Sequence, residues 1–396
     1  MTAVSITPLT PLEVASGLIF GFTPPETLPS PDEAGTPIEA LERAILPALL
    51  RPPCLVSFSG GRDSSTVLAV AVNLARREGL ELPVPATNRF PRAEGSDESA
   101  WQERVIVHLG LTEWLRLEFT DELDTVGPVA MRVLRKHGLV TPFNAHFHVP
   151  LFEEALGGSV ITGIGGDEAL GVQRWARAAN VLAGKVRPRP RDVLTLGLAA
   201  APSPVRRAVL ARRDTPILLP WLRPNVQQEV WSRWVATVAS QPLRWQGRFA
   251  WYRRLRYIRL GLESLGGLAA DFRVEAHHPF VDAGFSASVA GLPREDRFLG
   301  RTAAMRELFG HLLPADVAAR RSKSQYDFAF WAAHSRALVQ AWDGNSVDTE
   351  LVDPEILRQE WSQPSPDART YPLLQTVALA RESAVGEPPQ AVGSFA

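Results

Sequence analysis

The 396-residue chain lacks the features that mark secreted and membrane proteins. Its one cysteine, Cys54, excludes an internal disulfide and fits a reducing compartment, so we expect a cytoplasmic protein. No basic and apolar signal opens the chain, and no apolar run is long enough to span a bilayer. The formal net charge of −1 provides no overall basic field. We therefore expect neither a membrane nor a nucleic acid as a partner.

The sequence also shows no internal repeat and no coiled-coil heptads. Its length allows two or three domains, or one domain with a large extension. Residues 1–48 are predicted to form an arm that packs on the rest, with a disordered leader as the alternative. Beyond the arm, composition and periodicity predict an α/β core over residues 49–175, a mostly helical part over residues 176–385 and a frayed tail over residues 386–396.

The stretch CLVSFSGGRDSS, residues 54–65, predicts a strand, a tight turn and a helix. Its apolar first five residues have the length of a buried parallel strand, and Gly60 and Gly61 interrupt them. Helical spacing of apolar residues follows directly, so the glycines should form a strand-to-helix turn. The backbone N–H groups at such a helix N-terminus bind anions.

Asp63 in this turn is unexpected beside an anion unless a cation joins them. A nucleotide polyphosphate with its Mg²⁺ supplies both, because the metal binds carboxylate and phosphate oxygens together. A simpler interpretation is a glycine turn followed by an N-capping Asp or Ser, which explains most such strings taken alone. The turn lacks the lysine of a Walker A motif, which argues against a kinase-type phosphate loop.

Strand and helix patterns alternate from residue 54 to residue 175. Further strands are predicted over residues 82–87, 115–119 and 159–162, with helices over 97–109 and 151–156. This alternation is typical of a parallel, doubly wound sheet, which binds ligands at the carboxyl ends of its strands. A second glycine turn, GIGGDE at residues 163–168, follows the last of these strands. We therefore expect both turns on one rim of the sheet.

The first turn matches the SGGxDS signature of the PP-loop ATP pyrophosphatases. With the second turn, TGIGGDE, it resembles the synthetase domain of asparagine synthetase and its relatives, β-lactam synthetase and the lasso-peptide cyclases. The resemblance implies a PP-loop sheet of the adenine nucleotide α-hydrolase type, whose helical C-terminal part completes the active site. Further elements similar to those of the family follow in order: Asp97 with Glu98, residues 275–282, residues 301–306, Leu313 with Pro314, and residues 320–323.

The resemblance implies a ligase that uses ATP and Mg²⁺ in two half-steps. A substrate carboxylate attacks the α-phosphate, pyrophosphate leaves, and an amine then displaces AMP to form an amide. By position, Asp63 and Asp167 would hold Mg²⁺. Lys323 would stabilise the phosphorus centre or the later tetrahedral one, although an ordinary surface lysine is the alternative. Ser59, Gly60, Gly61 and Ser64 would bind pyrophosphate, and the backbones of Ser57, Asn88 and Gly163 would border the adenosine.

One departure from the family concerns the base that deprotonates the amine. Ile164 stands where asparagine synthetase has a glutamate and β-lactam synthetase a tyrosine. Isoleucine cannot accept a proton, so the base must lie elsewhere or the amine must arrive neutral. The candidates for the base are Glu168, Tyr326, His277 and His278. For each of the two histidines, a structural role is favoured over catalysis.

A second departure concerns the nitrogen source. Residue 2 is threonine, whereas the glutamine-using members have a cysteine after the initiator Met, so we expect no glutaminase within this chain. Among the relatives, this loss goes with an amine supplied by the substrate. It favours macrolactam (lasso-type) or other amide formation on a peptide or natural-product precursor, with a leader-peptide-binding protein or a protease as a candidate partner. The alternatives are an amidotransferase subunit using ammonia or a partner's amine, a nucleotide-binding pseudoenzyme or scaffold, and a tRNA-modifying enzyme.

Two basic features have open roles. Arg89, after the second predicted strand, could bind a substrate carboxylate or pair with Asp97. The stretch RWQGRFAWYRRLRYIR, residues 244–259, interleaves arginine with aromatic residues, as nucleic-acid-binding faces do. The near-neutral net charge favours a partly buried helix whose arginines pair with acids. A peptide-binding groove is the intermediate interpretation.

Overall fold

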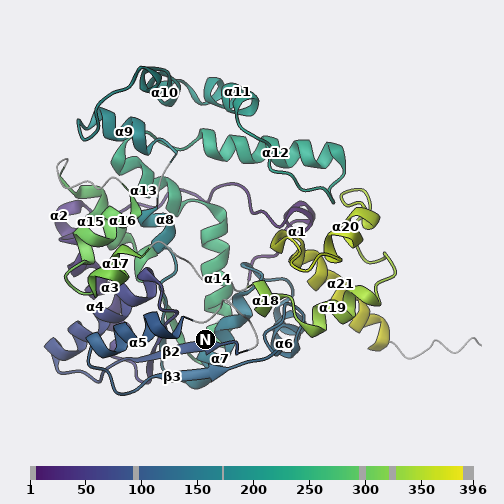
Figure 1. Cartoon of the computed structure of the whole chain (residues 1–396), viewed down its shortest axis with the longest axis horizontal. Helices are drawn as coiled ribbons and strands as arrows, with labels where there is room; N and C mark the ends of the chain where they lie inside the picture. The colour runs from purple at the N-terminus through teal and green to yellow at the C-terminus, as the bar shows by residue number, and fades with distance from the viewer. Residues whose placement is uncertain (1–5, 92–97, 172–173, 294–299, 321–326, 387–396) are drawn as a thin grey trace, which may run out of the picture.

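The computed structural model describes residues 6–91, 98–171, 174–293, 300–320 and 327–386. Within these ranges, five strands form one parallel sheet in the order β3-β2-β1-β4-β5 (Figure 1). The chain therefore has the α/β fold with a parallel sheet that the sequence predicts. The strands are β1 (Cys54–Ser57), β2 (Val84–Arg89), β3 (Leu115–Glu118), β4 (Ser159–Ile161) and β5 (Glu275–His277).

Helices cover both faces of the sheet. Successive strand residues point to opposite sides, and in β1 the residues on both sides are apolar and must be buried. Val56 of β1 packs in one apolar cluster with α3 (Pro37–Leu49) and α4 (Arg62–Glu78). Its neighbour Leu55 packs in another with α7 (Val149–Glu154) and α14 (Arg256–Ala270). Both faces of β1 are therefore buried, as its continuous apolar sequence predicts. Near these layers lie α5 (Ser99–His108), α6 (Pro128–His137), η1 (Ala145–His148), η2 (Pro279–Val281) and α15 (Ala283–Gly291).

The first four strands lie close to their predicted positions, while β5 comes from the part of the chain predicted to be mostly helical. Its three residues pair with β4 in register, with Ala276 opposite Val160. This strand joins the C-terminal part to the sheet. The remaining helices of that part are α8 (Gly166–Leu170), α9 (Ala176–Leu182), α10 (Pro190–Ala200), α11 (Ser203–Arg213), α12 (Pro224–Ala239), α13 (Trp245–Arg253), α16 (Arg301–Phe309), α17 (Ala315–Ala319), α18 (Asp327–Phe330), α19 (Ala333–Gln340), α20 (Pro354–Trp361), η3 (Ala368–Thr370) and α21 (Tyr371–Gly386).

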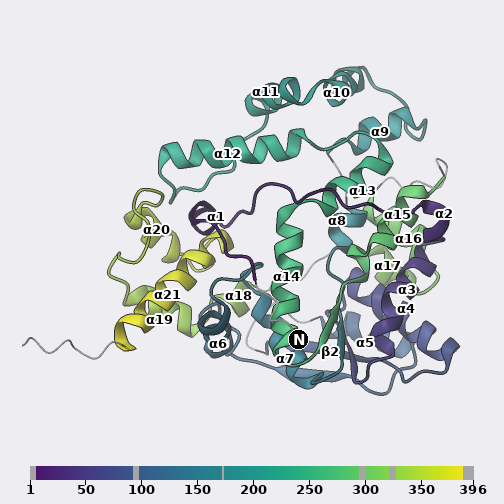
Figure 2. The same ribbon diagram turned by 180° about the vertical axis from the view of Figure 1, so that it is seen from behind.

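The N-terminal arm, residues 6–36 of the described chain, crosses the molecule as an ordered segment. It contains α1 (Pro11–Ser16) and α2 (Pro31–Ala34), each begun by a capping box. Figures 1 and 2 show it running from α1, beside the C-terminal helices, past the start of α14 to α2. At the crossing Thr23 N donates to Arg254 O over 2.8 Å. The arm thus lies beside the C-terminal helices at α1 and contacts the chain just before α14 at Thr23.

Several arginines of residues 244–259 pair with acids or with this arm. Arg253 forms an ion pair with Glu26 at 2.7 Å, and Arg254 donates to Thr23 O over 3.1 Å. Arg248 lies over the Trp245 ring at 4.3 Å and is half-buried. These contacts confirm the prediction of a partly buried helical segment with paired arginines. No helix of the described chain is long and apolar enough to cross a membrane.

Candidate active site

The first glycine turn brings β1 into α4 at the carboxyl edge of the sheet. Gly60 has φ +77°, and a Cβ on it would lie 2.7 Å from Gln102 Cγ, so both conformation and space require glycine. Ser59 Oγ and Ser64 Oγ lie 3.1 Å apart across the turn. Among the described residues no side chain caps α4, which begins after Gly61. The first N–H groups of this helix are therefore available to an anion.

The second glycine turn brings β4 into α8 directly beside the first. A Cβ on Gly163 would lie 2.8 Å from Ser64 N, and one on Gly166 would lie 2.4 Å from Asp63 Cγ. The two turns touch because β1 and β4 are neighbours in the sheet. The strand order reverses between them, and open α/β sheets bind ligands at such a switch point. The expectation that both turns share one rim is thus met by the sheet order.

Asp63 and Asp167 lie on these turns with Arg301 of α16 between them. Arg301 Nη2 lies 2.5 Å from Asp63 Oδ2, and Arg301 Nη1 pairs with Asp167. Burial raises the pKa of Asp63, while Arg301 opposes this shift. Asp63 Oδ1 is buried and has no hydrogen-bond partner among the described residues. Such an oxygen is a position where a cation would bind.

The donor set fits Mg²⁺ held together with phosphate. Among the described residues no three His, Cys, Asp or Glu side chains are grouped closely enough to hold a metal by themselves. Two carboxylates are what Mg²⁺ commonly takes from a protein when phosphate oxygens complete its shell. Asp63 and Asp167 would therefore hold the ion, with Arg301 as their counter-charge in this structure.

Glu168 follows Asp167 and is a third carboxylate whose pKa responds to the charges of the other two. Burial raises its pKa, and the charges of Asp167 and Asp63 raise it further. Tyr257 Oη of α14 donates a hydrogen bond of 3.5 Å to Glu168 Oε1. A raised pKa makes a carboxylate a better proton acceptor at neutral pH. Of the base candidates in the described chain, Glu168 has the properties that proton removal requires.

The other residues around the second turn have structural contacts. The side chain of Ile164 packs against the apolar cluster of α7 and α14. His278 Nδ1 lies 2.7 Å from Thr162 Oγ1, and burial lowers the pKa of His278 to about 3. Burial also lowers the pKa of His277, whose Nε2 lies 3.6 Å from Glu275 Oε2. Both histidines are therefore neutral at physiological pH.

The remaining predicted residues are distributed along the edge of the sheet. Ser57 ends β1, and Asn88 of β2 donates from Nδ2 to Phe147 O over 2.8 Å, while its Oδ1 is buried and has no partner among the described residues. Arg89 donates to Ser99 Oγ over 2.7 Å, which ties it to α5. Three predicted residues lie outside the described residues: Lys323, Tyr326 and Asp97.

Two arginines have roles that sequence reasoning missed. The sequence places Arg301 only within the family-like element of residues 301–306 and gives no sign that it lies between the two aspartates. Arg320 forms a buried ion pair with Glu98, and both side chains are about 7% exposed or less. Arg320 also donates to Gly60 O over 3.3 Å and lies 4.7 Å from the Trp101 ring. The only sequence signal for these two roles is that Arg301 and Arg320 lie in the family-like elements of residues 301–306 and 320–323.

Comparison with known proteins identifies the family. A search of curated proteins gives no significant match. A family model described as asparagine synthase matches residues 39–381, which include both glycine turns, Arg301 and Arg320. Residues 1–38, which include the described N-terminal arm of residues 6–36, lie outside the matched range. Because the match covers most of the 396 residues, the chain belongs to the asparagine synthase family of ATP-dependent, amide-forming ligases.

Proposed function

We propose that the chain is an AMP-forming carboxylate–amine ligase. It would join a substrate carboxylate to the α-phosphate of ATP, release pyrophosphate, and transfer the acyl group to an amine. The observation that carries this proposal is the placement of Asp63, Asp167 and Glu168 beside the uncapped N-terminus of α4. One site thus offers an anion-binding helix end, two carboxylates for a metal and a third for a proton.

The phosphates would lie against the first turn. The N–H groups of α4 and the hydroxyls of Ser59 and Ser64 donate hydrogen bonds to phosphate oxygens there. Mg²⁺ bound by Asp63 and Asp167 would neutralise phosphate charge. Arg301, which already lies at these carboxylates, supplies a second positive charge within reach of the leaving pyrophosphate. Lys323 is proposed for the same charge stabilisation at the reacting phosphorus.

Glu168 would act in the second half-step. An ammonium substrate must lose a proton before its nitrogen can attack the acyl carbon. Glu168 takes this proton, the C–N bond forms, and the C–O bond to AMP breaks. The hydrogen bond from Tyr257 fixes the orientation of the carboxylate. Ile164 is partly buried against the apolar cluster of α7 and α14 and cannot accept a proton, so we assign this role to Glu168.

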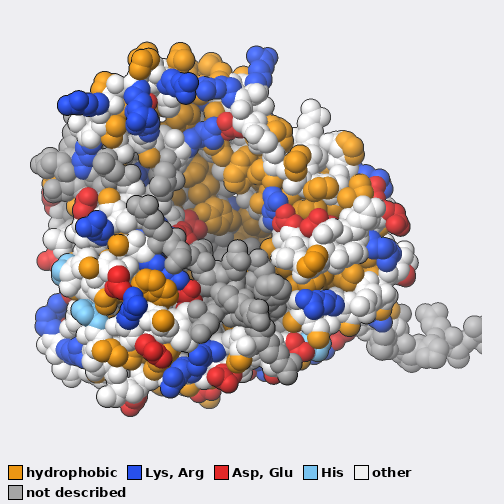
Figure 3. Space-filling view, viewed as in Figure 1, with side chains coloured by type: hydrophobic (Ala, Val, Ile, Leu, Met, Phe, Trp, Pro, Cys, Tyr) orange, Lys and Arg blue, Asp and Glu red, His pale blue; other side chains and the backbone are white. Residues whose placement is uncertain are grey.

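The substrate class that we propose is a peptide or natural-product precursor that carries both reacting groups. Macrolactam closure of the lasso type is one form of this reaction, with a leader-peptide-binding protein or a protease as a partner. Figure 3 shows a broad hollow on the face where the helices of the C-terminal part meet. Such a hollow suits a substrate larger than aspartate.

Exchange of radiolabelled pyrophosphate into ATP tests the adenylation step. The protein is incubated with ATP, Mg²⁺ and a panel of peptides bearing free carboxylates, and exchange above the substrate-free rate is expected. Asp63→Asn should reduce exchange by at least about a hundredfold, because it removes a carboxylate that holds the metal. Asp32→Asn, on the exposed surface of α2, is the matched control. Absence of both peptide-stimulated exchange and ATP binding would refute the ligase and favour a scaffold.

A further inference from the structure

We propose that an apolar pocket beside Tyr257 binds the hydrophobic side chain of the amine substrate, and that the N-terminal arm forms one of its walls. This inference rests on the proposed function, because it assigns the pocket to the amine that Glu168 deprotonates. The cavity has a volume of about 310 Å³. Its lining consists of Leu9, Glu13, Gly17, Leu18, Ile19, Val140, Thr141, Pro142, Phe143, Trp234, Tyr257, Ala368, Arg369 and Pro372.

The pocket lies where separate parts of the fold converge. Trp234 belongs to α12, Tyr257 to α14, and Leu18 to the arm after α1. Hydrophobic side chains gather in the hollow of Figure 3, at the place where Figure 1 shows α12, α14 and α1 approaching each other. Trp234 and Tyr257 are each 38% exposed, which is high for large aromatic side chains. Their rings offer apolar surface to a ligand.

Tyr257 connects the pocket to the active site. Its ring lines the cavity, and its hydroxyl donates to Glu168 Oε1 over 3.5 Å. A group in the pocket is therefore one side chain away from the proposed base. Glu168 follows Asp167 in α8, and its hydrogen bond from Tyr257 is the link between the pocket and the site. We therefore assign the pocket to the amine that Glu168 deprotonates, rather than to the adenylated carboxylate.

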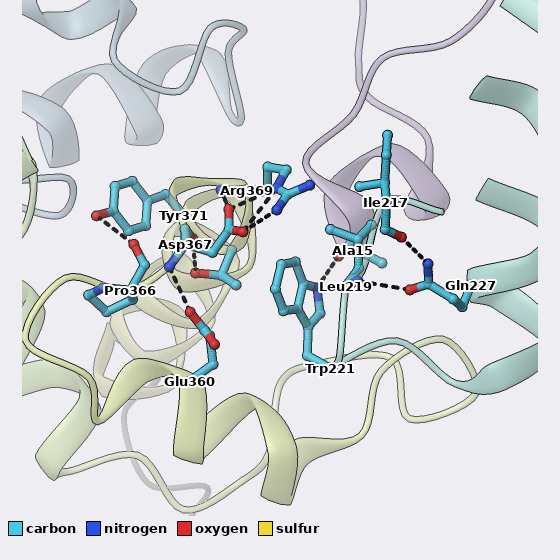
Figure 4. Close-up of polar contacts among 11 residues, drawn as sticks. Ala15, Ile217, Leu219, Trp221, Gln227, Glu360, Pro366, Asp367, Arg369 and Tyr371 are labelled. Carbon is cyan, nitrogen blue, oxygen red and sulfur yellow. Dashed lines mark hydrogen bonds and ion pairs between the residues drawn. The ribbon is translucent and has the colours of Figure 1, made fainter. Parts of the chain in front are cut away.

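The charged residues of the lining are already paired. Glu13 is 3% exposed and pairs with Arg256. Arg369 Nε donates to Asp367 Oδ1 over 2.8 Å, as Figure 4 shows. A charged ligand group in the pocket would have to compete with these partners. The lining therefore favours a neutral, apolar group, and the volume is at the small end for ligand sites, enough for an aromatic or branched aliphatic side chain.

The wall contributed by the arm is held firmly in place. Trp221 Nε1 donates to Ala15 O of α1 over 2.8 Å, and Figure 4 shows the indole pointing at this carbonyl. Gly17 has φ +63°, and a Cβ there would lie 2.2 Å from Arg369 O, so the arm makes close backbone contact with η3. This wall belongs to residues 1–38, which lie outside the range matched by the family model.

The substrate class is therefore a primary amine that carries an aromatic or branched aliphatic side chain, such as the N-terminal residue of a peptide. Calorimetric titration compares 2-phenylethylamine with ethylamine as probes. Wild type should bind 2-phenylethylamine at least about tenfold more tightly, because the phenyl ring leaves water. Glu168→Gln should weaken the binding of 2-phenylethylamine but not the binding of the neutral 2-phenylethanol, because only the amine interacts with the carboxylate.

Leu18→Trp fills the pocket and should reduce the preference for 2-phenylethylamine to within about twofold, since the ring can no longer be buried. Leu194→Trp, on an exposed face of α10, adds the same side chain elsewhere and should leave the preference intact. If Leu18→Trp does not fold, Trp234→Ala is used instead. It removes a wall of the pocket and should likewise abolish the preference for 2-phenylethylamine over ethylamine.

The proposal is overturned if wild type shows no preference for the phenyl ring. It is equally overturned if the preference persists in the folded pocket variant. ATP binding with Mg²⁺ is measured in parallel on the same proteins. Its absence in wild type would refute the proposed ligase function without deciding the pocket. Loss of the ring preference with ATP binding retained reports on the pocket alone.

Discussion

Asp63 and Glu168 are two carboxylates of one site whose surroundings give them different chemistry. Burial raises the pKa of both. Asp63 faces Arg301, and one of its oxygens has no partner in the part of the chain that the structure describes, whereas Glu168 accepts a hydrogen bond from Tyr257. The first arrangement suits a carboxylate that binds a cation, and the second suits one that takes up a proton. Environment rather than residue type separates the two roles.

Glu168→Gln should slow amine capture by about a hundredfold or more, the usual contribution of a general base. Pyrophosphate exchange should stay within about threefold of wild type, because the base acts only after adenylation. Glu154→Gln, on the exposed surface of α7, is the control. Equal losses in exchange and capture would contradict this division of roles.

The pH dependence of capture follows from the same residue. A base acts in its deprotonated form, so the rate should rise with pH through the pKa of Glu168. Because that pKa is raised, the rise should lie above the ordinary value of 4.5. Single-turnover capture of 2-phenylethylamine by the acyl-adenylate measures it, because this amine is an ammonium ion throughout that pH range. Glu168→Gln should remove this rise, and a rise that persists in the variant would assign it to another group.

Arg301 is the residue for which the structure adds most to the sequence. Its guanidinium lies where a cation between Asp63 and Asp167 would be attracted. Arg301→Gln should tighten binding of Mn²⁺ in the absence of ATP by about tenfold, because a competing charge is removed. Electron paramagnetic resonance titration of free Mn²⁺ measures this. Weaker binding in the variant would show that Arg301 supports the metal site rather than competing with it.

At the scale of elements, the site depends on two strand-to-helix turns in contact. Gly60 of the first turn meets Gln102 of α5, and the glycines of the second turn leave no room for a side chain beside Ser64 and Asp63 of the first. Their contact follows from the pairing of β1 with β4, and α16 then adds Arg301. Arg320, which forms a buried ion pair with Glu98, donates a hydrogen bond to Gly60 O and so holds the first turn in place. The geometry of the site therefore depends on contacts between these elements and not on any one of them alone.

Gly60→Ala should weaken ATP binding by at least about tenfold, since a Cβ at φ +77° strains the turn and meets Gln102. Gly266→Ala is the matched control, because its Cβ would enter open space within α14. Alanine at that helix position should stabilise the fold by about 0.5–1 kcal/mol. Thermal unfolding and ATP titration of both variants give the comparison. Normal ATP affinity in Gly60→Ala would contradict the strained turn.

At the scale of the whole molecule, the arm joins the sheet domain to the C-terminal helices. Its contacts reach Arg254 and Arg256 near the start of α14 on one side and Trp221 and Arg369 on the other. Glu13 is the most deeply buried charge of the arm that pairs with another element. The arm therefore contributes to stability as well as to the pocket.

Arg256→Ala should destabilise the fold by about 3–5 kcal/mol, because it leaves Glu13 buried without its charged partner. The double variant with Glu13→Gln should recover part of this loss. Arg259→Ala, which removes a more exposed pair with Glu263, should cost no more than about 1 kcal/mol. Chemical denaturation measures all three. Similar losses for Arg256→Ala and Arg259→Ala would show that the arm is only loosely attached.

Local patterns predicted much of this fold, and tertiary contacts supplied the rest. The turn at Gly60 and the strands on both sides of it were predictable because strand, glycine and helix follow each other within one stretch. β5 has the sequence Glu-Ala-His and lacks the apolar residues that mark the equally short β4, and it pairs with β4 across more than a hundred residues. The place of Arg301 between the aspartates and the walls of the pocket likewise depend on packing between distant segments.

The measurement that tests the central claim most directly is the identity of the nucleotide products. Phosphorus NMR can follow ATP during amide formation on a peptide that supports pyrophosphate exchange. The account predicts AMP and pyrophosphate in equal amounts with the amide, and loss of both in Asp63→Asn. Formation of ADP and phosphate, or of AMP at an undiminished rate in Asp63→Asn, would contradict it.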